Sequence, residues 1–260
     1  MIAAVLDWFE DFVRDCGMDD PQDAARLELK RQHCLLVMAE AREQARELDL
    51  SQRLTDLATV AGLTHDTGRF PQYRRWRTFR DAASANHAVL GTTALARHGG
   101  LAGLGERDRF LVRLAIMAHN RRALPKGLLT GGDDEALVLA RIVRDADKLD
   151  ILRVMLEHFK SPGEKDGVVF LDLPDVPDRY NPAIIDQIEA GRIGNYDAME
   201  TVNDFALLLL SWVNDMNHAR TRRLFFRRGQ VRELFDQLPD TPEMRAFAER
   251  YHDRFAPRTT

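Results

Sequence analysis

The chain has 260 residues, of which 45% are hydrophobic and 30% are charged, and its formal net charge is −4. This composition is typical of a folded globular protein and excludes a disordered or fibrous one. The near-neutral charge also argues against a nucleic-acid-binding protein, because such domains are strongly basic.

The sequence predicts neither a membrane span nor a secretory signal. The longest apolar run, 205–213, is interrupted only by Ser211 and is well short of the roughly 18 residues that a span requires. The N-terminal segment carries Asp7, Glu10 and Asp11 and lacks the basic stretch of a signal peptide. We therefore expect a cytoplasmic protein with no membrane contact.

Two cysteines, Cys16 and Cys34, are present, and they form no C-x-x-C pair. This spacing excludes a thiolate zinc site and leaves no disulfide framework. Any metal ion would therefore be held by histidine and carboxylate groups.

Apolar residues at three- and four-residue spacing predict a series of helices. The first begins at the cap residue Asp20 and at Pro21 and ends near Leu48. Further helices are expected near 51–65, 84–97, 106–119 and 133–159. The connector 161–181 is rich in Pro, Gly and Asp; its apolar patch 168–171 allows a short strand pair or an ordered loop, and we interpret the connector as mostly loop. Helices near 182–190, 196–217, 230–237 and 241–255 follow. No long alternating run predicts a strand, so the predicted fold class is all-α.

The dipeptide His65-Asp66, followed by Thr67-Gly68-Arg69, stands where a helical pattern meets a turn. Adjacent helical residues point about 100° apart, so both side chains can approach one ion only near a helix end. Alone, the pair is weak support for a metal site. The sequence adds a series near the core faces or ends of other predicted helices: His33, His87, His119 and the acidic cluster Asp145-Ala146-Asp147.

This series resembles the HD-domain superfamily of metal-dependent phosphohydrolases, in which a histidine is followed by an His-Asp pair and then by a distal aspartate. The matching segments are Arg31-Gln32-His33, Leu63-Thr64-His65-Asp66-Thr67-Gly68-Arg69-Phe70 and Arg144-Asp145-Ala146-Asp147-Lys148-Leu149-Asp150. The resemblance covers about residues 25–160. It implies a helical bundle in which His33, His65, Asp66 and Asp147 bind metal, with Asp145 and Asp150 as competing choices for the distal ligand.

His87 and His119 match the extra histidines of two-metal HD subgroups, which include cyclic-nucleotide phosphodiesterases and HD-GYP enzymes. In those proteins the HD aspartate bridges two ions. The match is partial, since Asn120 and Arg121 stand where HD-GYP proteins usually have His and Glu. The resemblance therefore implies one or two divalent ions, and Mn, Fe, Ni, Co, Zn and Mg all stay open. Gly91, one turn after His87, would allow a helix or a phosphate to approach the backbone closely.

Basic residues follow the HD pair. Arg69 stands where HD proteins commonly carry a cation that faces the phosphate, so we predict it as a catalytic residue. Arg74 belongs to the segment 69–80, which is either a basic loop that packs its aromatic residues on the core or a collar that attracts an anionic substrate. Arg122 would form the opposite wall or an exposed loop charge. Lys148 would contact the phosphate or neutralise Asp145.

The predicted function is that of a metal-dependent phosphohydrolase, a phosphomonoesterase or phosphodiesterase. It would act on a nucleotide or another small phosphorylated metabolite through a metal-activated water, with Asp66, Arg69 and Lys148 as catalytic residues. The alternatives are an HD-type di-iron oxygenase, which has the same ligand order, and a non-catalytic, metal-stabilised sensor that binds a nucleotide. We expect a single domain with a metal-binding core at about 25–160 and a C-terminal helical extension at about 182–256. The apolar C-terminal helices offer a face for a homodimer.

Overall fold

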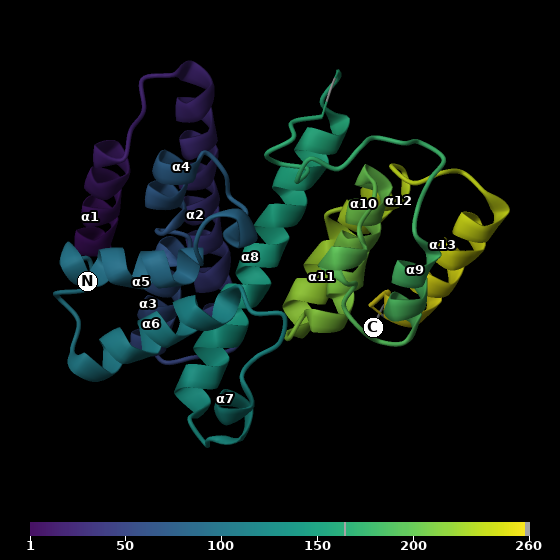
Figure 1. Ribbon diagram of the computed structural model, residues 1–260. Coiled ribbons are helices and arrows are strands. Elements are labelled where there is room, and N and C mark those ends of the chain that lie inside the picture. Colours follow the sequence, from purple (N-terminus) through teal and green to yellow (C-terminus); the bar gives the residue numbers. More distant parts are fainter. Residues whose placement is uncertain (164, 258–260) are drawn as a thin grey trace. The chain divides into compact units, whose positions relative to one another are not determined.

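The computed structural model describes residues 1–163 and 165–257, and the regular elements of these residues are helices without any β-strand (Figure 1). The all-α prediction is therefore confirmed. The apolar patch 168–171 forms turns, as the loop interpretation expects. The chain divides into two compact units, Met1–Asp150 and Ile151–Thr260. Two compact units can belong to one domain, so the single domain stays a prediction.

Unit 1 contains α1 to α7 and the first part of α8. The helices α2, α3, α5, α6 and α8 lie within three residues of their predicted bounds, whereas α1, α4 and α7 were not predicted. The bounds are α1 (Ile2–Asp15), α2 (Pro21–Glu47), α3 (Gln52–Thr64), α4 (Arg69–Trp76), α5 (His87–Arg97), α6 (Glu106–His119), α7 (Lys126–Thr130) and α8 (Asp134–Lys160). A short 3-10 turn, Asp81–Ala83, precedes α5.

Side-chain caps fix where three helices of unit 1 begin. Asp20 accepts hydrogen bonds from the backbone amides of Gln22 and Asp23 at the start of α2. Ser51 caps α3 in the same way. Asn86 accepts from the amide of Val89, so α5 begins at residue 87. Each cap satisfies amides that have no partner within their own helix, and it thereby fixes the register of that helix.

The core of unit 1 forms where α2, α3 and α6 pack together. Every residue of α3 from Leu57 to Thr64 is buried. The buried hydroxyls of Thr59 and Thr64 donate to carbonyls one turn earlier, at 2.7 and 2.8 Å, so the burial of these polar groups leaves no hydrogen bond unmade. The HD pair thus follows a helix whose C-terminal part is buried on every face.

The unpredicted helix α1 belongs to the same unit. Its Phe9 is fully buried and packs edge-on against Phe70, with ring centroids 5.8 Å apart. Glu10 accepts from Arg31 of α2 at 2.6 and 2.9 Å. Unit 1 therefore extends to the N-terminal side of residue 25, where the predicted core begins.

Unit 2 contains the end of α8 and five further α-helices. Their bounds are α9 (Pro182–Glu189), α10 (Val202–Ser211), α11 (Ala219–Arg227), α12 (Gln230–Phe235) and α13 (Pro242–Phe255). The predicted continuous helix 196–217 is wrong: α10 is flanked by 3-10 turns at Tyr196–Ala198 and Trp212–Asp215. The reason is a capping box in which Thr201 and Asp204 each bind the other's backbone amide, so that α10 starts at residue 202. The helix α11 was not predicted.

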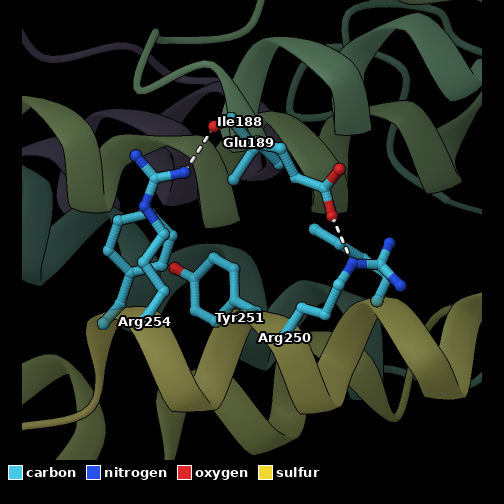
Figure 2. A pocket seen from close by; sticks show the side chains of 7 residues that line it. Ile188, Glu189, Arg250, Tyr251 and Arg254 are labelled. Atoms are coloured by element: carbon cyan, nitrogen blue, oxygen red, sulfur yellow. Dashed lines mark hydrogen bonds and ion pairs between the residues drawn. The ribbon is translucent and has the colours of Figure 1, made fainter.

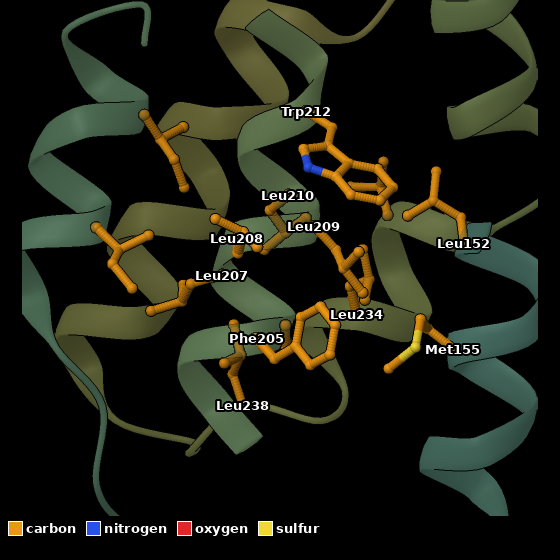
Figure 3. Close-up of a cluster of buried hydrophobic side chains, with 14 of the residues drawn as sticks. Leu152, Met155, Phe205, Leu207, Leu208, Leu209, Leu210, Trp212, Leu234 and Leu238 are labelled. Atoms are coloured by element: carbon orange, nitrogen blue, oxygen red, sulfur yellow. The ribbon is translucent and has the colours of Figure 1, made fainter. Parts of the chain in front are cut away.

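The core of unit 2 surrounds α10, whose residues are all buried. Figure 3 shows Leu207–Leu210 and Trp212 among the side chains of Leu152, Met155 and Leu234. A helix that is apolar all round has to be enclosed by others, which explains why the longest apolar run of the sequence lies here. Among the described residues, no helix combines the length and apolar character needed to cross a lipid bilayer.

Both cysteines are buried and free. Cys34 follows His33 in α2 and has no exposed surface. Burial raises the pKa of the Cys34 thiol well above its usual range, so the sulfur stays protonated.

Candidate metal centre

The His-Asp pair lies at the end of α3, as its sequence context predicts. The helix ends at Thr64, and His65 keeps a helical backbone as its C-terminal cap residue. The chain then turns tightly: the amide of Thr67 donates to the carbonyl of Thr64, and that of Arg69 donates to the carbonyl of Asp66 at 2.8 Å. The side chains of His65 and Asp66 can therefore approach one point from adjacent positions.

The turn after the pair packs directly on the first turn of α5. A Cβ added to Gly91 would lie 3.0 Å from the amide nitrogen of Gly68. The close approach that Gly91 was expected to allow is therefore made by the HD turn. It brings His87, the first residue of α5, next to Asp66.

The six predicted ligands lie together in unit 1, and four of them form a first half-site. The Nε2 atoms of His33 and His65 are 3.2 Å apart. They lie 3.2 and 3.4 Å from Oδ1 of Asp147, which comes from α8. Oδ2 of Asp66 lies 3.7 and 3.8 Å from the same two nitrogens. Of these four side chains only Asp147 is more than slightly exposed, at 14%.

The second half-site uses the other oxygen of Asp66. The Nε2 atoms of His87 and His119 are 3.0 Å apart, and they lie 3.3 and 3.7 Å from Oδ1 of Asp66. The two half-sites adjoin, since the rings of His65 and His119 are 5.0 Å apart between centroids. Asp66 thus presents one carboxylate oxygen to each pair of histidines.

Two of the histidines are oriented by their own helices. Nδ1 of His65 lies 2.8 Å from the carbonyl oxygen of Gly62, and Nδ1 of His119 lies 2.6 Å from that of Ile116. A carbonyl oxygen only accepts, so each Nδ1 carries the proton in this hydrogen-bond network. Each Nε2 therefore presents its lone pair to the cluster.

The other two histidines are oriented by carboxylates. Nδ1 of His33 lies 2.7 Å from Oδ2 of Asp150. Nδ1 of His87 lies 2.8 Å from both oxygens of Asp81. Carboxylates of this kind fix the tautomer of a metal-binding imidazole and make it a better ligand.

The donor set fits a divalent metal ion. In the neutral rings the facing Nε2 atoms of each half-site present lone pairs to one another, and a bound cation would relieve this repulsion. Ligands at right angles on an ion with bonds of about 2.1 Å lie about 3.0 Å apart, and tetrahedral ones about 3.4 Å. The nitrogen–nitrogen distances and those to Asp147 fall in the range 3.0–3.4 Å. Imidazole and carboxylate groups suit Mn, Fe, Co, Ni or Zn, and Mg with water ligands.

The charge states of the cluster favour a cation. Burial acts to raise the pKa of Asp66, but Lys30 Nζ at 3.0 Å and the guanidinium of Arg69 hold it well below its usual range. Burial also opposes ionisation of Asp147, yet the adjacent imidazoles of His33 and His65 hold its pKa well below the usual range. Both carboxyls are therefore ionised at neutral pH.

The histidines differ in charge state. Burial lowers the pKa of His65, and burial together with Arg69 lowers that of His87 to about 4, so both rings are neutral at pH 7. For His33, burial acts in the same direction, but hydrogen bonds with Asp147 and Asp150 outweigh it and raise the pKa. A proton on His33 is one that a metal ion would displace.

The aspartates of α8 have different positions. Asp147 faces the two imidazoles, whereas Asp150 binds Nδ1 of His33 from the side away from the cluster. Asp145 is fully buried. Lys148 is buried on the same helix.

Arg69 is the only one of the predicted substrate-binding residues that the described contacts bring to the cluster. Its Nε lies 3.4 Å from Oδ1 of Asp66. Its Nη1 donates to Gln72 at 3.0 Å, to Asp81 at 3.1 Å and to the carbonyl of Phe79.

The other two predicted substrate-binding residues are exposed. Arg74 donates to the carbonyl of Asp15 at 2.9 Å. Arg122 lies in the segment between α6 and α7. Their role in substrate binding stays a prediction.

The segment after the HD pair packs aromatic side chains on the core, as the first of its two interpretations expects, but its backbone is not a loop. Residues 69–76 are the helix α4 and not a loop, and Phe70 and Tyr73 are fully buried. Tyr73 stacks on Phe79 with ring centroids 4.7 Å apart. These aromatic rings therefore belong to the core and are not available to stack on a base.

Sequence reasoning missed Lys30 and Asp81. Lys30 precedes His33 by three residues, so helical spacing already places the two on one face of α2. Asp81 lies in a connecting segment with no periodicity, six residues before His87, and its contacts depend on the fold. Nothing in the sequence around it marks it.

A separate pocket of about 210 Å³ lies within unit 2 between α9 and α13 (Figure 2). Glu189 accepts from Arg250 at 2.7 Å, and its carbonyl accepts from Arg254. Phe247 and Tyr251 also line it. Both arginines are thus engaged by Glu189, and this pocket adds no group to the metal cluster.

Comparison with known proteins supports one assignment. Residues 31–152 match the family model of the HD domain. Searches of curated proteins and of solved structures each gave no significant match. The matched range contains all six residues of the two half-sites, from His33 to Asp147. The chain therefore contains an HD domain, which spans residues 31–152.

Proposed function

We propose that the protein is a metal-dependent phosphohydrolase that cleaves a phosphomonoester or phosphodiester bond in a nucleotide or another small phosphorylated metabolite. The superfamily is one of metal-dependent hydrolases, and the cluster has the residues to hold metal. The observation that carries the proposal is the position of Asp66 between two histidine pairs with two cations beside it. Lys30 lies 3.0 Å from one of its oxygens and Arg69 3.4 Å from the other.

His33, His65 and Asp147 would hold one ion, His87 and His119 a second, and Asp66 would serve both. Divalent ions in such a site polarise a phosphoryl oxygen and make a water acidic enough to attack phosphorus near neutral pH. The carboxylate of Asp66 is ionised and buried, so it orients groups that enter the cluster without titrating itself.

Lys30 and Arg69 would bind the phosphoryl oxygens. The Nε of Arg69 is buried and pairs with Oδ1 of Asp66 at 3.4 Å without a hydrogen bond of good geometry, so the guanidinium lies directly beside the cluster. Lys30 is 18% exposed and can reach both Asp66 and a bound anion. Cations held in place before the reaction stabilise the charge that develops on the oxygens in the transition state. Lys148 follows Asp147 and keeps its predicted catalytic role as part of this proposal.

The two alternative functions, a di-iron oxygenase and a nucleotide sensor, need different groups around the metal cluster. A di-iron oxygenase would use the same ligands, and a sensor would bind a nucleotide without turnover. The pair Lys30 and Arg69 favours hydrolysis, because a phosphoryl group needs cations beside the metal whereas oxygen chemistry does not. The cytoplasmic location and the homodimer stay predictions.

The experiment starts from protein stripped of metal by chelation. Separate samples are loaded with Mn²⁺, Co²⁺, Ni²⁺, Mg²⁺ or Fe²⁺ and incubated with an aryl phosphate, an aryl phosphodiester and a nucleotide panel, while phosphate release is measured. We expect turnover with at least one ion, and its loss in Asp66→Ala. Oxygen uptake by the iron-loaded sample without phosphate release would favour the oxygenase. Saturable nucleotide binding with no product in every metal would favour the sensor.

A further inference from the structure

Asp81 lies outside the metal cluster but contacts α4, α5 and the residue that follows α6. It belongs to the 3-10 turn between α4 and α5, and its side chain is 30% exposed. Oδ1 accepts from Gln72 at 2.9 Å and from Arg69 at 3.1 Å, both on α4. Oδ2 accepts from Asn120, just after α6, at 3.2 Å. Both oxygens lie 2.8 Å from Nδ1 of His87 on α5.

All of these partners are donors. Arg69 donates through its guanidinium, Gln72 and Asn120 through their amide nitrogens, and His87 through Nδ1 and through its backbone amide at 3.4 Å. Only a group that accepts with both of its atoms satisfies such a set. The surroundings of Asp81 are therefore built for a carboxylate.

The two half-sites depend on different supporting carboxylates. In each half-site one histidine is held by a carbonyl of its own helix, and this support is independent of side chains. The other histidine is held by a carboxylate, which is Asp150 for His33 and Asp81 for His87. A substitution at either aspartate should therefore affect one half-site and spare the other.

We propose that Asp81 is a positioning residue that controls metal binding at the second half-site by holding His87 with its Nε2 toward Asp66. The same carboxylate holds Arg69, so it links the second half-site to the cation that would bind the phosphoryl group. The inference rests on the metal binding that is part of the proposed function.

The change Asp81→Asn keeps the size of the side chain and replaces one acceptor atom by a donor. The new NH₂ group would face one of the donors, and His87 would lose its charged partner. Loss of such a supporting contact typically weakens metal binding tenfold to a hundredfold. We expect this loss for one ion of two, with the affinity for the other ion within about threefold of wild type.

The test measures metal binding directly, without turnover. Metal-free wild type, Asp81→Asn and Asp150→Asn are each titrated with Mn²⁺ and with Co²⁺ by calorimetry, and the bound metal is counted after equilibrium dialysis. Asp150→Asn is the matched control, because it makes the same carboxylate-to-amide change at the other supported histidine. Thermal melts of the metal-free proteins verify that each variant is folded.

A second pair of variants assigns the lost ion. In a His87→Ala background, Asp81→Asn should cause no further loss, because the ring that it orients is gone. In a His33→Ala background it should still weaken the ion that remains. If the two aspartate variants weaken the same ion, if Asp81→Asn leaves both affinities unchanged, or if wild type binds one ion, the proposal is wrong. Because no outcome depends on hydrolysis, a protein that binds two ions as expected but cleaves no phosphoester would contradict the proposed function alone.

Discussion

Gly68 and Gly91 bring two backbones into direct contact beside the metal cluster. A Cβ added to Gly68 would lie 1.9 Å from the carbonyl oxygen of His87 and 2.5 Å from the amide nitrogen of Gly91. Both distances are far below van der Waals contact, and both atoms belong to a rigid helical turn. The HD turn and the start of α5 can therefore lie this close only because neither glycine has a side chain.

Gly68→Ala should push α5 away from the HD turn and carry His87 with it. The backbone of Gly68 has a φ of −70°, so the cost comes from the contact and not from the conformation of alanine. We expect a loss of stability of about 3 kcal/mol, as for severe overpacking, and weaker binding of one metal ion. Urea denaturation and metal titration measure the two effects.

The control for this variant is Gly103→Ala, since a Cβ at Gly103 would meet no atom within 4 Å. It should change stability by less than about 0.5 kcal/mol. Equal effects of the two substitutions would contradict the role of the backbone contact.

Removal of metal should destabilise unit 1. Ions that bind the folded state alone add about 2.7 kcal/mol at a concentration one hundred times the dissociation constant. A chelator should therefore lower the melting temperature of wild type. It should change that of Asp66→Ala much less, because this variant lacks the carboxylate shared by both half-sites. Calorimetric melts with and without Mn²⁺ provide the comparison, and an equal response of both proteins would contradict the assignment of Asp66.

Lys30→Gln should lower kcat/KM for a phosphoester by about a hundredfold, which is typical for the loss of one group that stabilises transition-state charge. The ammonium lies 3.0 Å from Asp66 Oδ2. The control is Arg46→Gln on the same helix, where the arginine pairs with Glu43 at an exposed position. Initial rates at limiting substrate should leave the control at the wild-type value, and an unchanged Lys30→Gln enzyme would exclude Lys30 from substrate binding.

Arg144→Met should destabilise the end of α6 that carries His119. Nη1 of Arg144 donates to the carbonyls of Ala118, His119 and Arg121 at 3.1, 3.0 and 2.5 Å, and the residue is buried. Loss of charged hydrogen bonds to buried carbonyls costs about 2–3 kcal/mol. Denaturation should show this loss, whereas Arg113→Met, at an exposed position of α6, should stay within about 0.5 kcal/mol of wild type.

Tyr251 should make unit 2 less stable in alkali. Its buried hydroxyl donates to the carbonyl of Leu210 at 2.8 Å, and burial raises its pKa well above 10. Above pH 10 the unfolded chain has lost this proton while the folded chain keeps it, so stability falls as pH rises through that window. Below pH 10 the contribution of Tyr251 is complete.

Tyr251→Phe should therefore be less stable than wild type by about 1 kcal/mol at pH 7, through the lost hydrogen bond. This difference should shrink between pH 10 and 11, because the phenylalanine has no proton to lose. Urea denaturation at several pH values measures it. Tyr196→Phe, at an exposed position, is the control, and a constant difference across this range for Tyr251→Phe would contradict the explanation.

Much of the candidate site could be predicted because four of its six predicted ligands lie on regular helices and the other two directly follow one. His33, His65, Asp66 and Asp147 stand in short sequence motifs that can be read without the structure. The structure places these four side chains within reach of one another. The support of the site could not be predicted in the same way. Asp81 reaches His87 only because the segment before α5 folds back, and this depends on contacts among α4, α5 and α6.

The helices, too, could be predicted only where local sequence determines them. The helices α2 and α3 begin at caps that are visible in the sequence, Asp20 and Ser51. By contrast, α4 has four polar or charged residues among eight and one proline, and it is helical because Phe70 and Tyr73 pack into the core. Local pattern fails where tertiary packing decides the conformation.

The rate at which the buried thiol of Cys34 is alkylated can report how often unit 1 opens. The sulfur lies beside His33 in α2 and has no exposed surface. An alkylating reagent therefore reacts only with molecules in which α2 has separated from its neighbours, and the labelling rate counts these events. Metal ions that tie α2 to α3 and α8 would slow the labelling in proportion to the stability they add to this part of the chain.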